Sequence, residues 1–236
     1  MTAVNELNFA VEQGTIKALI GPNGAGKTTT FNMVTGLLVP SRGSVFFKGE
    51  ELTARPPHVR AKKGLSRTFQ IVRPFAEMTV LENVMVGCDM RTGSGLFSAA
   101  LRLPRCLKDE RMVRQKAMEE LEFVGLGGRA NAPATSLPMG EQRVMEIARA
   151  LASDPEIVLF DEPAAGLNEK ETDQLARNLL RIKERGITIL LVEHDMRLVM
   201  RVSDEVTVIN YGSLIAEGTP SEIRNNPEVI TAYLGK

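Results

Sequence analysis

Eight residues near the amino terminus have the types and spacing of a phosphate-binding loop. Residues 21–28 read Gly-Pro-Asn-Gly-Ala-Gly-Lys-Thr and match the pattern G-x-x-x-x-G-K-[ST] at every fixed position. The glycines let consecutive N–H groups point at phosphate oxygens. Lys27 supplies a cation for the β- and γ-phosphates of a nucleotide, and the Thr28 hydroxyl can hold Mg²⁺. A plain helix cap is the alternative, but it would leave the lysine without a partner.

A second group of reactive side chains follows an apolar strand. Residues 157–160 are Ile-Val-Leu-Phe, and Asp161 and Glu162 come directly after them. Two acids at the end of a buried strand suit phosphate chemistry if Asp161 binds Mg²⁺ through water and Glu162 polarises the attacking water. The alternative is that both acids cap the helix after Pro163.

The elements around these motifs predict an α/β fold. A β-branched run feeds the glycine loop, which feeds a helix, and the second half alternates helices with continuous apolar strands, as in a largely parallel sheet. A charged stretch between Met90 and Gly128 has helical spacing and is expected to be an inserted helical subdomain. The predicted strands are 15–20, 44–48, 156–160, 187–192 and a hairpin over 205–217, and the predicted helices are 26–38, 105–124, 169–185 and 196–202.

Composition limits the class of protein. The 236 residues are 43% apolar and 25% charged, with 29 basic and 29 acidic side chains, so no global field favours nucleic acid as a partner. The apolar runs fall short of the roughly 20 residues that span a bilayer. Cys88 and Cys106 lack metal-ligand spacing and are expected to be free thiols, which suggests the cytoplasm.

Further motifs resemble those of ABC ATPases, in that family's order along almost the whole chain. Residues 137–143 (Leu-Pro-Met-Gly-Glu-Gln-Arg) with 147–151 (Ile-Ala-Arg-Ala-Leu) are similar to the signature segment. Gln70 resembles the Q-loop glutamine, residues 165–168 (Ala-Gly-Leu-Asn) the D-loop, and His194 the switch histidine. Taken singly, Gln70 could be a solvated strand-end residue and His194 a helix cap.

The resemblance implies one P-loop NTPase domain, with a nucleotide-binding core and antiparallel β subdomain in residues 1–88 and 154–236 and a helical subdomain in 89–153. It implies ATP and Mg²⁺ as ligands, with Glu162, His194 and Gln70 catalytic and with Thr28, Gln70 and Asp161 at the metal. The residues expected to bind nucleotide are Gly21, Pro22, Asn23, Gly24, Ala25, Gly26, Lys27, Thr28, Thr29, Pro138, Met139, Gly140 and Glu141.

The same resemblance implies partners and a place in the cell. Two ATPase subunits, identical or not, would sandwich two ATP molecules, each bound by the loop of one chain and the signature of the other. Integral membrane permease subunits would dock near residues 71–86, where Val72, Phe75, Met78 and Val80 are candidate lining residues or, equally, core residues. A solute-binding protein would act indirectly, and the chain would sit at the cytoplasmic face of the inner membrane.

Finer features are similar to ATPase subunits of branched-chain amino-acid importers. They include residues 66–70 (Ser-Arg-Thr-Phe-Gln), residues 78–84, the insertion after Met90, Asn168 and the carboxyl-terminal end. Urea or other solute transporters share parts of this pattern, so the solute stays open. A module that has lost hydrolysis is the other alternative.

Two positions depart from the family pattern. Pro138 stands where a serine usually contacts the γ-phosphate on the partner chain, which removes a hydroxyl and a backbone donor. The fold should tolerate it, since proline suits the first turn of a helix, but the nucleotide sandwich should be weaker. The family's adenine-stacking aromatic and edge strand, usually placed before residues 3–14, have no counterpart, which is expected to leave backbone unpaired at the sheet edge.

Overall fold

The computed structural model describes residues 2–68, 73–88 and 104–234. The strands are β1 Ile16–Ile20, β2 Phe46–Phe47, β3 Glu50–Glu51, β4 Leu65–Arg67, β5 Ile157–Asp161, β6 Thr188–Val192, β7 Glu205–Asn210 and β8 Ser213–Gly218. The helices are α1 Lys27–Thr35, α2 Pro57–Lys62, α3 Val80–Cys88, α5 Pro104–Val124, α6 Met139–Leu151, α7 Glu169–Glu184, α8 Met196–Val202, α9 Pro220–Arg224 and α10 Pro227–Leu234. Short 3₁₀ turns lie at Gly127–Arg129 and Ala134–Ser136.

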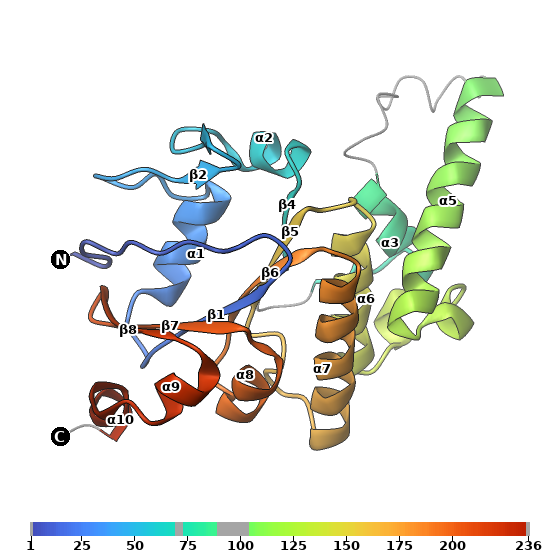
Figure 1. The fold of residues 1–236 in the computed structure, drawn as a ribbon. Coiled ribbons are helices and arrows are strands. Elements are labelled where there is room, and N and C mark those ends of the chain that lie inside the picture. Colours follow the sequence, from blue (N-terminus) through green and yellow to red (C-terminus); the bar gives the residue numbers. More distant parts are fainter. Residues whose placement is uncertain (1, 69–72, 89–103, 235–236) are drawn as a thin grey trace.

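A six-stranded sheet forms the centre of the fold (Figure 1). Its strand order is β4-β5-β6-β1-β7-β8, and every pairing is parallel except the antiparallel β7–β8 hairpin. The register pairs Val192 of β6 with both Leu19 of β1 and Asp161 of β5. These three strands therefore end at the same edge of the sheet, and the segments that follow them meet there. This confirms the predicted largely parallel α/β core.

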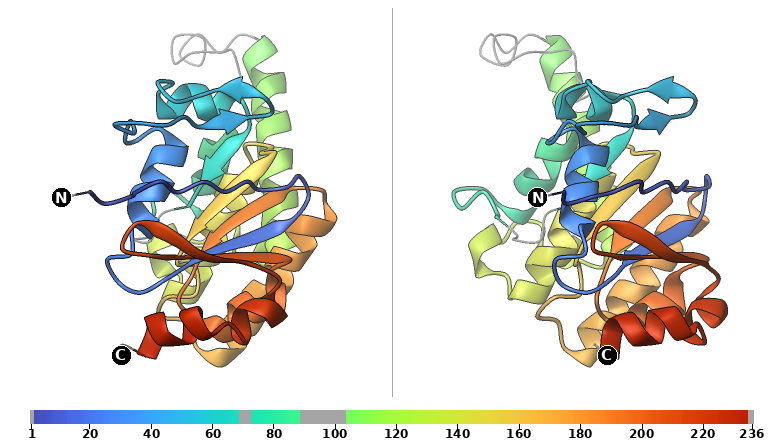
Figure 2. Two further views of the ribbon diagram at one scale, coloured as in Figure 1. Left: turned by 60° about the vertical axis from the view of Figure 1, so that its left-hand side comes forward. Right: turned by 90° about the vertical axis from the view of Figure 1, so that its left-hand side faces the viewer.

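Apolar residues cover both faces of the sheet, as the continuous hydrophobic strands require. On one face Phe160 and Leu191 join a cluster that includes side chains of α6 and α7. On the other face Leu159 and Leu190 pack in a cluster with Phe31 of α1. The helices seen on either side of the sheet in Figure 2 thus bury alternate residues of the same strands.

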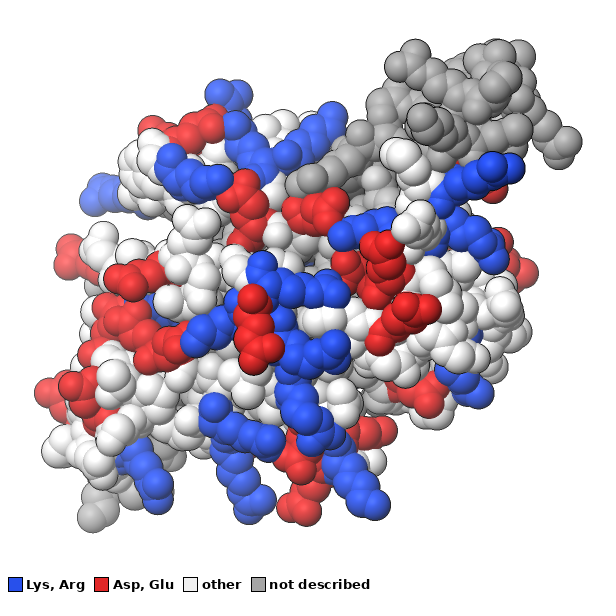
Figure 3. Space-filling view, turned by 45° about the vertical axis from the view of Figure 1, so that its right-hand side comes forward, with Lys and Arg blue, Asp and Glu red and all other residues white. Residues whose placement is uncertain are grey.

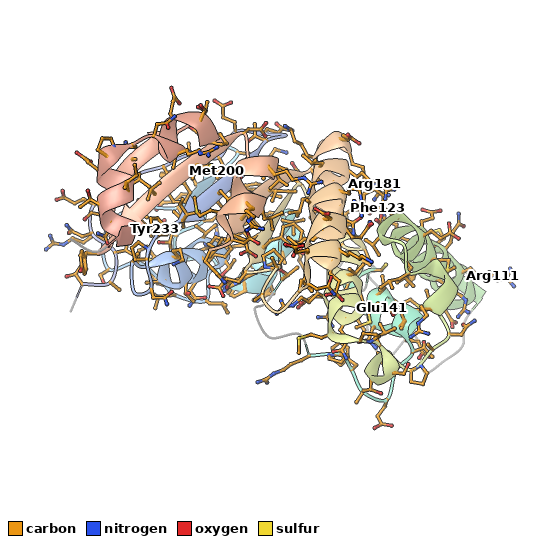
Figure 4. The ribbon with its side chains drawn as sticks, turned by 90° about the horizontal axis from the view of Figure 1, so that it is seen from below. Arg111, Phe123, Glu141, Arg181, Met200 and Tyr233 are labelled. Carbon is orange, nitrogen blue, oxygen red and sulfur yellow. The ribbon has the colours of Figure 1, made fainter. Side chains whose placement is uncertain are left out.

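The helical region α3, α5 and α6 forms one packed unit beside the sheet (Figure 1). Its connection to the core includes a cluster in which Arg181 and Arg185 of α7 flank the ring of Phe123, at 4.2 and 3.3 Å from the ring centroid. Arg181 Nη1 also donates to the Phe123 carbonyl at 2.7 Å. Figure 4 displays Phe123 and Arg181 side by side. Cation–π contacts therefore tie the end of α5 to α7.

Two predicted elements are shorter in the structure than the sequence indicates. The helix predicted over 26–38 ends at Thr35, because Gly36 has φ 80° and its N–H caps the Met33 carbonyl. The strand predicted over 44–48 is only the two-residue β2, paired with β3 in a small antiparallel sheet. The strands and helices of the second half lie within two residues of their predicted bounds.

The amino-terminal segment covers the sheet instead of extending it. Leu7, Phe9 and Val11 pack against the α1-side cluster. The Asn5 N–H donates to the Gly212 carbonyl at 2.8 Å, in the turn between β7 and β8. Residues 2–14 form no strand in the structure. The segment therefore adds apolar burial to the fold but no further strand to the sheet.

Candidate nucleotide-binding and hydrolysis site

The glycine loop follows β1 at the shared sheet edge, and its fold requires glycine. A Cβ at Gly21 would lie 2.1 Å from the Ile209 carbonyl oxygen, and one at Gly26 would lie 2.6 Å from that of Ala3. Gly26 also has φ 105°, in the region that side chains disfavour, and serves as N-cap of α1. Close backbone packing at Gly21 and Gly26 thus fixes the conformation of the loop. Asn23, Gly24 and Thr28 are exposed to solvent.

Lys27 is buried at the first position of α1 and bonds back across its own loop. Its Nζ donates to the carbonyls of Gly21 at 2.7 Å and Pro22 at 3.0 Å. Burial lowers the pKa of the Lys27 amine, while the nearby carboxylates of Glu162 and Asp161 act in the opposite direction. The expected phosphate-binding lysine therefore lies beside both predicted acidic residues.

Asp161 ends β5 in a buried ion pair. Arg67 Nη2 lies 2.7 Å from Asp161 Oδ2, and the two side chains are 9% and 6% exposed. Arg67 Nη1 donates to Asn32 Oδ1 and Thr35 Oγ1 on α1. In the sequence Arg67 is visible only as part of the motif at residues 66–70, and its position three residues before Gln70 gives no signal of this role. Arg67 fixes the Asp161 carboxylate to the helix that follows the glycine loop.

The residues present suit a magnesium ion. Asp161 supplies a fixed carboxylate and Thr28 an exposed hydroxyl, and both are the hard oxygen donors that Mg²⁺ prefers. Mg²⁺ is usually held by one or two carboxylates together with substrate phosphates and water, so one fixed carboxylate beside the glycine loop is enough protein charge for such a site.

Glu162 occupies a strained backbone position next to the switch histidine. Its φ is 48°, rare for a residue other than glycine. Its N–H donates to the Val192 carbonyl at 2.9 Å, and its carbonyl accepts from Ala165 N–H at 3.2 Å and from Arg143 Nη1 at 3.4 Å. His194 Nδ1 lies 3.8 Å from Glu162 Oε2, and its side chain is 60% exposed. The two predicted catalytic groups are thus brought together at the solvent edge.

The signature residues Pro138 to Glu141 lie apart from the glycine loop, although Arg143 of the same segment reaches the Glu162 carbonyl. Pro138 is the N-cap of α6, with Pro138 and Met139 exposed and Gly140 buried. A Cβ at Gly140 would lie 2.4 Å from Glu171 Oε1 of α7. Figure 4 places Glu141 at the start of α6, apart from α1. The four predicted signature residues therefore do not join the loop of their own chain.

Other predicted functional positions have mixed outcomes. Gln70 and Val72 lie outside the described residues. Asn168 is the N-cap of α7, where its side chain and Glu171 form a capping box. Phe75 and Met78 are 46% and 38% exposed, as a docking surface requires, whereas Val80 is fully buried and belongs to the core. Of the two roles expected for Val80, groove lining or core, its burial bears out the core role.

The charge distribution is mixed. Acidic and basic side chains are interspersed over the face drawn in Figure 3, in keeping with the equal totals of the sequence. In the part of the chain that the structure describes, no helix is long and apolar enough to span a bilayer.

Comparison with known families decides the assignment. A family model described as "ABC transporter" matches residues 4–165. The chain belongs to the ABC transporter family. A second model, "Branched-chain amino acid ATP-binding cassette transporter", matches residues 213–236. The protein is therefore a nucleotide-binding ABC ATPase, as the resemblance of its motifs predicted.

Named relatives agree with this family assignment. The "High-affinity branched-chain amino acid transport ATP-binding protein" BraF of Pseudomonas aeruginosa is 46% identical over 100% of this chain and 93% of its own length. LivG of Escherichia coli, which carries the same description, has the same identity and coverage. A crystal structure of a nucleotide-free ATP-binding cassette from an ABC transporter superposes with TM-score 0.85 at 35% identity, covering 99% of this chain and 93% of that one.

Proposed function

We propose that this ABC ATPase binds and hydrolyses MgATP to power the uptake of branched-chain amino acids. The observation that carries the ATPase part is the convergence of Lys27, Asp161, Glu162 and His194 at one sheet edge. The solute is inferred from the relatives' descriptions and from the carboxyl-terminal family match, because the transported molecule does not touch this subunit.

Binding begins at residues 21–29. Backbone N–H groups of the loop and the amino-terminal end of α1 attract the phosphates. The Lys27 amine leaves the carbonyls of Gly21 and Pro22 and donates to the β- and γ-phosphates instead. Thr28 and Asp161 are the residues that would hold Mg²⁺, which neutralises charge on the phosphate oxygens when bound. Arg67 keeps the Asp161 carboxylate in place for that task.

Glu162 and His194 are the residues that carry out hydrolysis. Glu162 accepts a hydrogen bond from the attacking water and orients it, and His194 donates to the γ-phosphate. Gln70 adds a contact at the metal or the water, as the resemblance implies. The 3.8 Å between His194 Nδ1 and Glu162 Oε2 would put the water held by Glu162 next to the phosphate held by His194.

The complete site needs a second subunit. Members of the ABC transporter family work as paired ATP-binding subunits on membrane permease subunits. The signature residues Pro138, Met139, Gly140 and Glu141 would close the nucleotide site of the partner. Residues 89–153 would form the helical subdomain together with α3, which packs on α5 and α6, and the rest of residues 1–88 and 154–236 would form the core. Exposed Phe75 and Met78 would meet the permease at the cytoplasmic face of the membrane, with a solute-binding protein acting indirectly.

The test is steady-state hydrolysis by the wild type and by Glu162→Gln at millimolar ATP and Mg²⁺. We expect hydrolysis that the variant loses, and a dimer of the variant that forms only with ATP, detected by light scattering. The matched control is Glu169→Gln, an exposed acid seven residues on, which should leave the rate unchanged. Equal rates in wild type and Glu162→Gln, or dimers that form without ATP, would refute the proposal.

A further inference from the structure

Glu193 precedes the switch histidine and is one of the most deeply buried carboxyl groups in the described part of the protein. The residue is 1% exposed and its side chain 0%. It lies at the shared sheet edge, one residue after β6. Burial raises the pKa of this carboxyl, and three backbone hydrogen bonds act in the opposite direction. A buried acid of this kind is costly unless its oxygens are satisfied.

Its two oxygens bond to two different loops. Oε1 accepts from the Ala164 N–H at 2.6 Å, two residues after Glu162. Oε2 accepts from the N–H groups of His194 at 3.0 Å and Asp195 at 3.3 Å. Among the described residues, the basic side-chain nitrogen nearest to the Glu193 carboxyl is His194 Nδ1, at 4.0 Å from Oε2. The carboxyl group therefore links backbone to backbone rather than balancing a buried cation.

We propose that Glu193 is a positioning residue that sets the loop of Glu162 and the loop of His194 in one fixed relation. This rests on the proposed function, because it concerns how the water-orienting acid and the phosphate donor of that function are aligned. Glu162 sits at a strained φ of 48° that the surrounding contacts must hold. The bond to Ala164 lies on the chain immediately after that position, and the bonds to His194 and Asp195 orient the switch.

Both carboxyl oxygens of Glu193 act as acceptors. A glutamine has one acceptor oxygen, and its NH₂ group would face a backbone N–H at either Ala164 or the His194–Asp195 pair. Glu193→Gln therefore keeps the shape of the side chain but breaks one of the two links. Since a displacement of about 1 Å at an active site can cost about 100-fold in rate, we expect kcat to fall by about 10- to 100-fold. The KM for ATP should change by less than about threefold, because Lys27 and the glycine loop are untouched.

The control is Glu120→Gln. Glu120 is 3% exposed, but it lies on α5 and pairs with Lys116 and Arg185, far from the motifs of the site. The same chemical change there should lower the melting temperature and leave kcat unchanged. A purely structural role of Glu193 predicts instead that both variants lose activity only in proportion to the protein that unfolds.

A second measurement does not depend on turnover. Hydrogen exchange followed by mass spectrometry should show faster exchange at Ala164, or at His194 and Asp195, in folded Glu193→Gln, with the amides of α5 unchanged. Unaltered exchange at all three amides, or a kcat within threefold of wild type, would overturn the proposal. An inactive wild type would refute the proposed function, and the exchange comparison would still decide whether Glu193 links the two loops.

Discussion

Pro138 gives the sharpest test of the paired site. It is the N-cap of α6, a 13-residue helix, and has no side-chain capping bond. The position is exposed, and α6 begins with Met139. The N-cap is one residue before the first turn predicted for this proline, and the missing N–H is harmless there too. Pro138→Ser would add a hydroxyl at this point without disturbing packing.

The expected gains follow from what that hydroxyl can do. As an acceptor it can cap the N–H of Gly140 or Glu141, worth about 1 kcal/mol, or a melting temperature higher by about 2–4 °C in a chain of this size. As a donor it can bond to the γ-phosphate on the second subunit. A hydrogen bond to a charged group contributes about 1.5–3 kcal/mol, which is roughly 10- to 100-fold in kcat/KM if it forms in the transition state. One hydroxyl can serve in both ways.

The assay is ATP hydrolysis against ATP concentration, with the melting temperature measured on the same samples. Pro138→Ala is the matched control, because it restores the backbone N–H without the hydroxyl. We expect Pro138→Ser to exceed both wild type and Pro138→Ala in kcat/KM. A serine variant that melts higher but hydrolyses no faster than the alanine variant would refute the placement of Pro138 against a phosphate.

Three further outcomes are expected. Lys27→Met should weaken nucleotide binding by roughly 10- to 100-fold in a fluorescence titration, because a charged hydrogen bond to phosphate is lost. Arg60, 1% exposed, donates five bonds to backbone carbonyls around the end of α1. Arg60→Met should lower the free energy of unfolding by several kcal/mol, since each buried carbonyl left without its donor costs about 1–3 kcal/mol; exposed Arg55→Met is the control, and denaturant unfolding is the measurement. Tyr233 is 39% exposed as a whole residue, and partial burial raises its pKa to about 12, against a bond from the Gly21 backbone. The phenolate absorbance of the wild type, less that of Tyr233→Phe, should titrate with its midpoint at this pKa. Because the folded state favours the neutral phenol, the contribution of Tyr233 to the free energy of unfolding should fall as the pH rises from 10 toward 12.

The sequence predicted helices, strands and motifs better than it predicted the tertiary contacts between them. Strands such as residues 187–192 are legible because they are continuous apolar runs, and the glycine loop because its pattern is demanding. The two-residue β2 has no periodicity to detect, so its predicted bounds were wrong. Arg67 and Glu193 escaped notice because each acts through tertiary contacts, the first with Asp161 and the second with Ala164, which are 94 and 29 residues away. A charged residue next to a motif is common on surfaces, and only its burial reveals the role.

The sheet register explains which motifs can act within one chain. Leu19, Asp161 and Val192 lie in register across β1, β5 and β6, so the loops that follow these strands must meet. The signature segment stands at the start of α6, which packs on α3 and α5. Its contacts are with the segment that follows Asp161: Arg143 Nη1 donates to the Glu162 carbonyl at 3.4 Å, and Gly140 lies against Glu171 of α7. Pro138 and Met139 are exposed, which leaves them open to the nucleotide of a second subunit, as the proposed function requires.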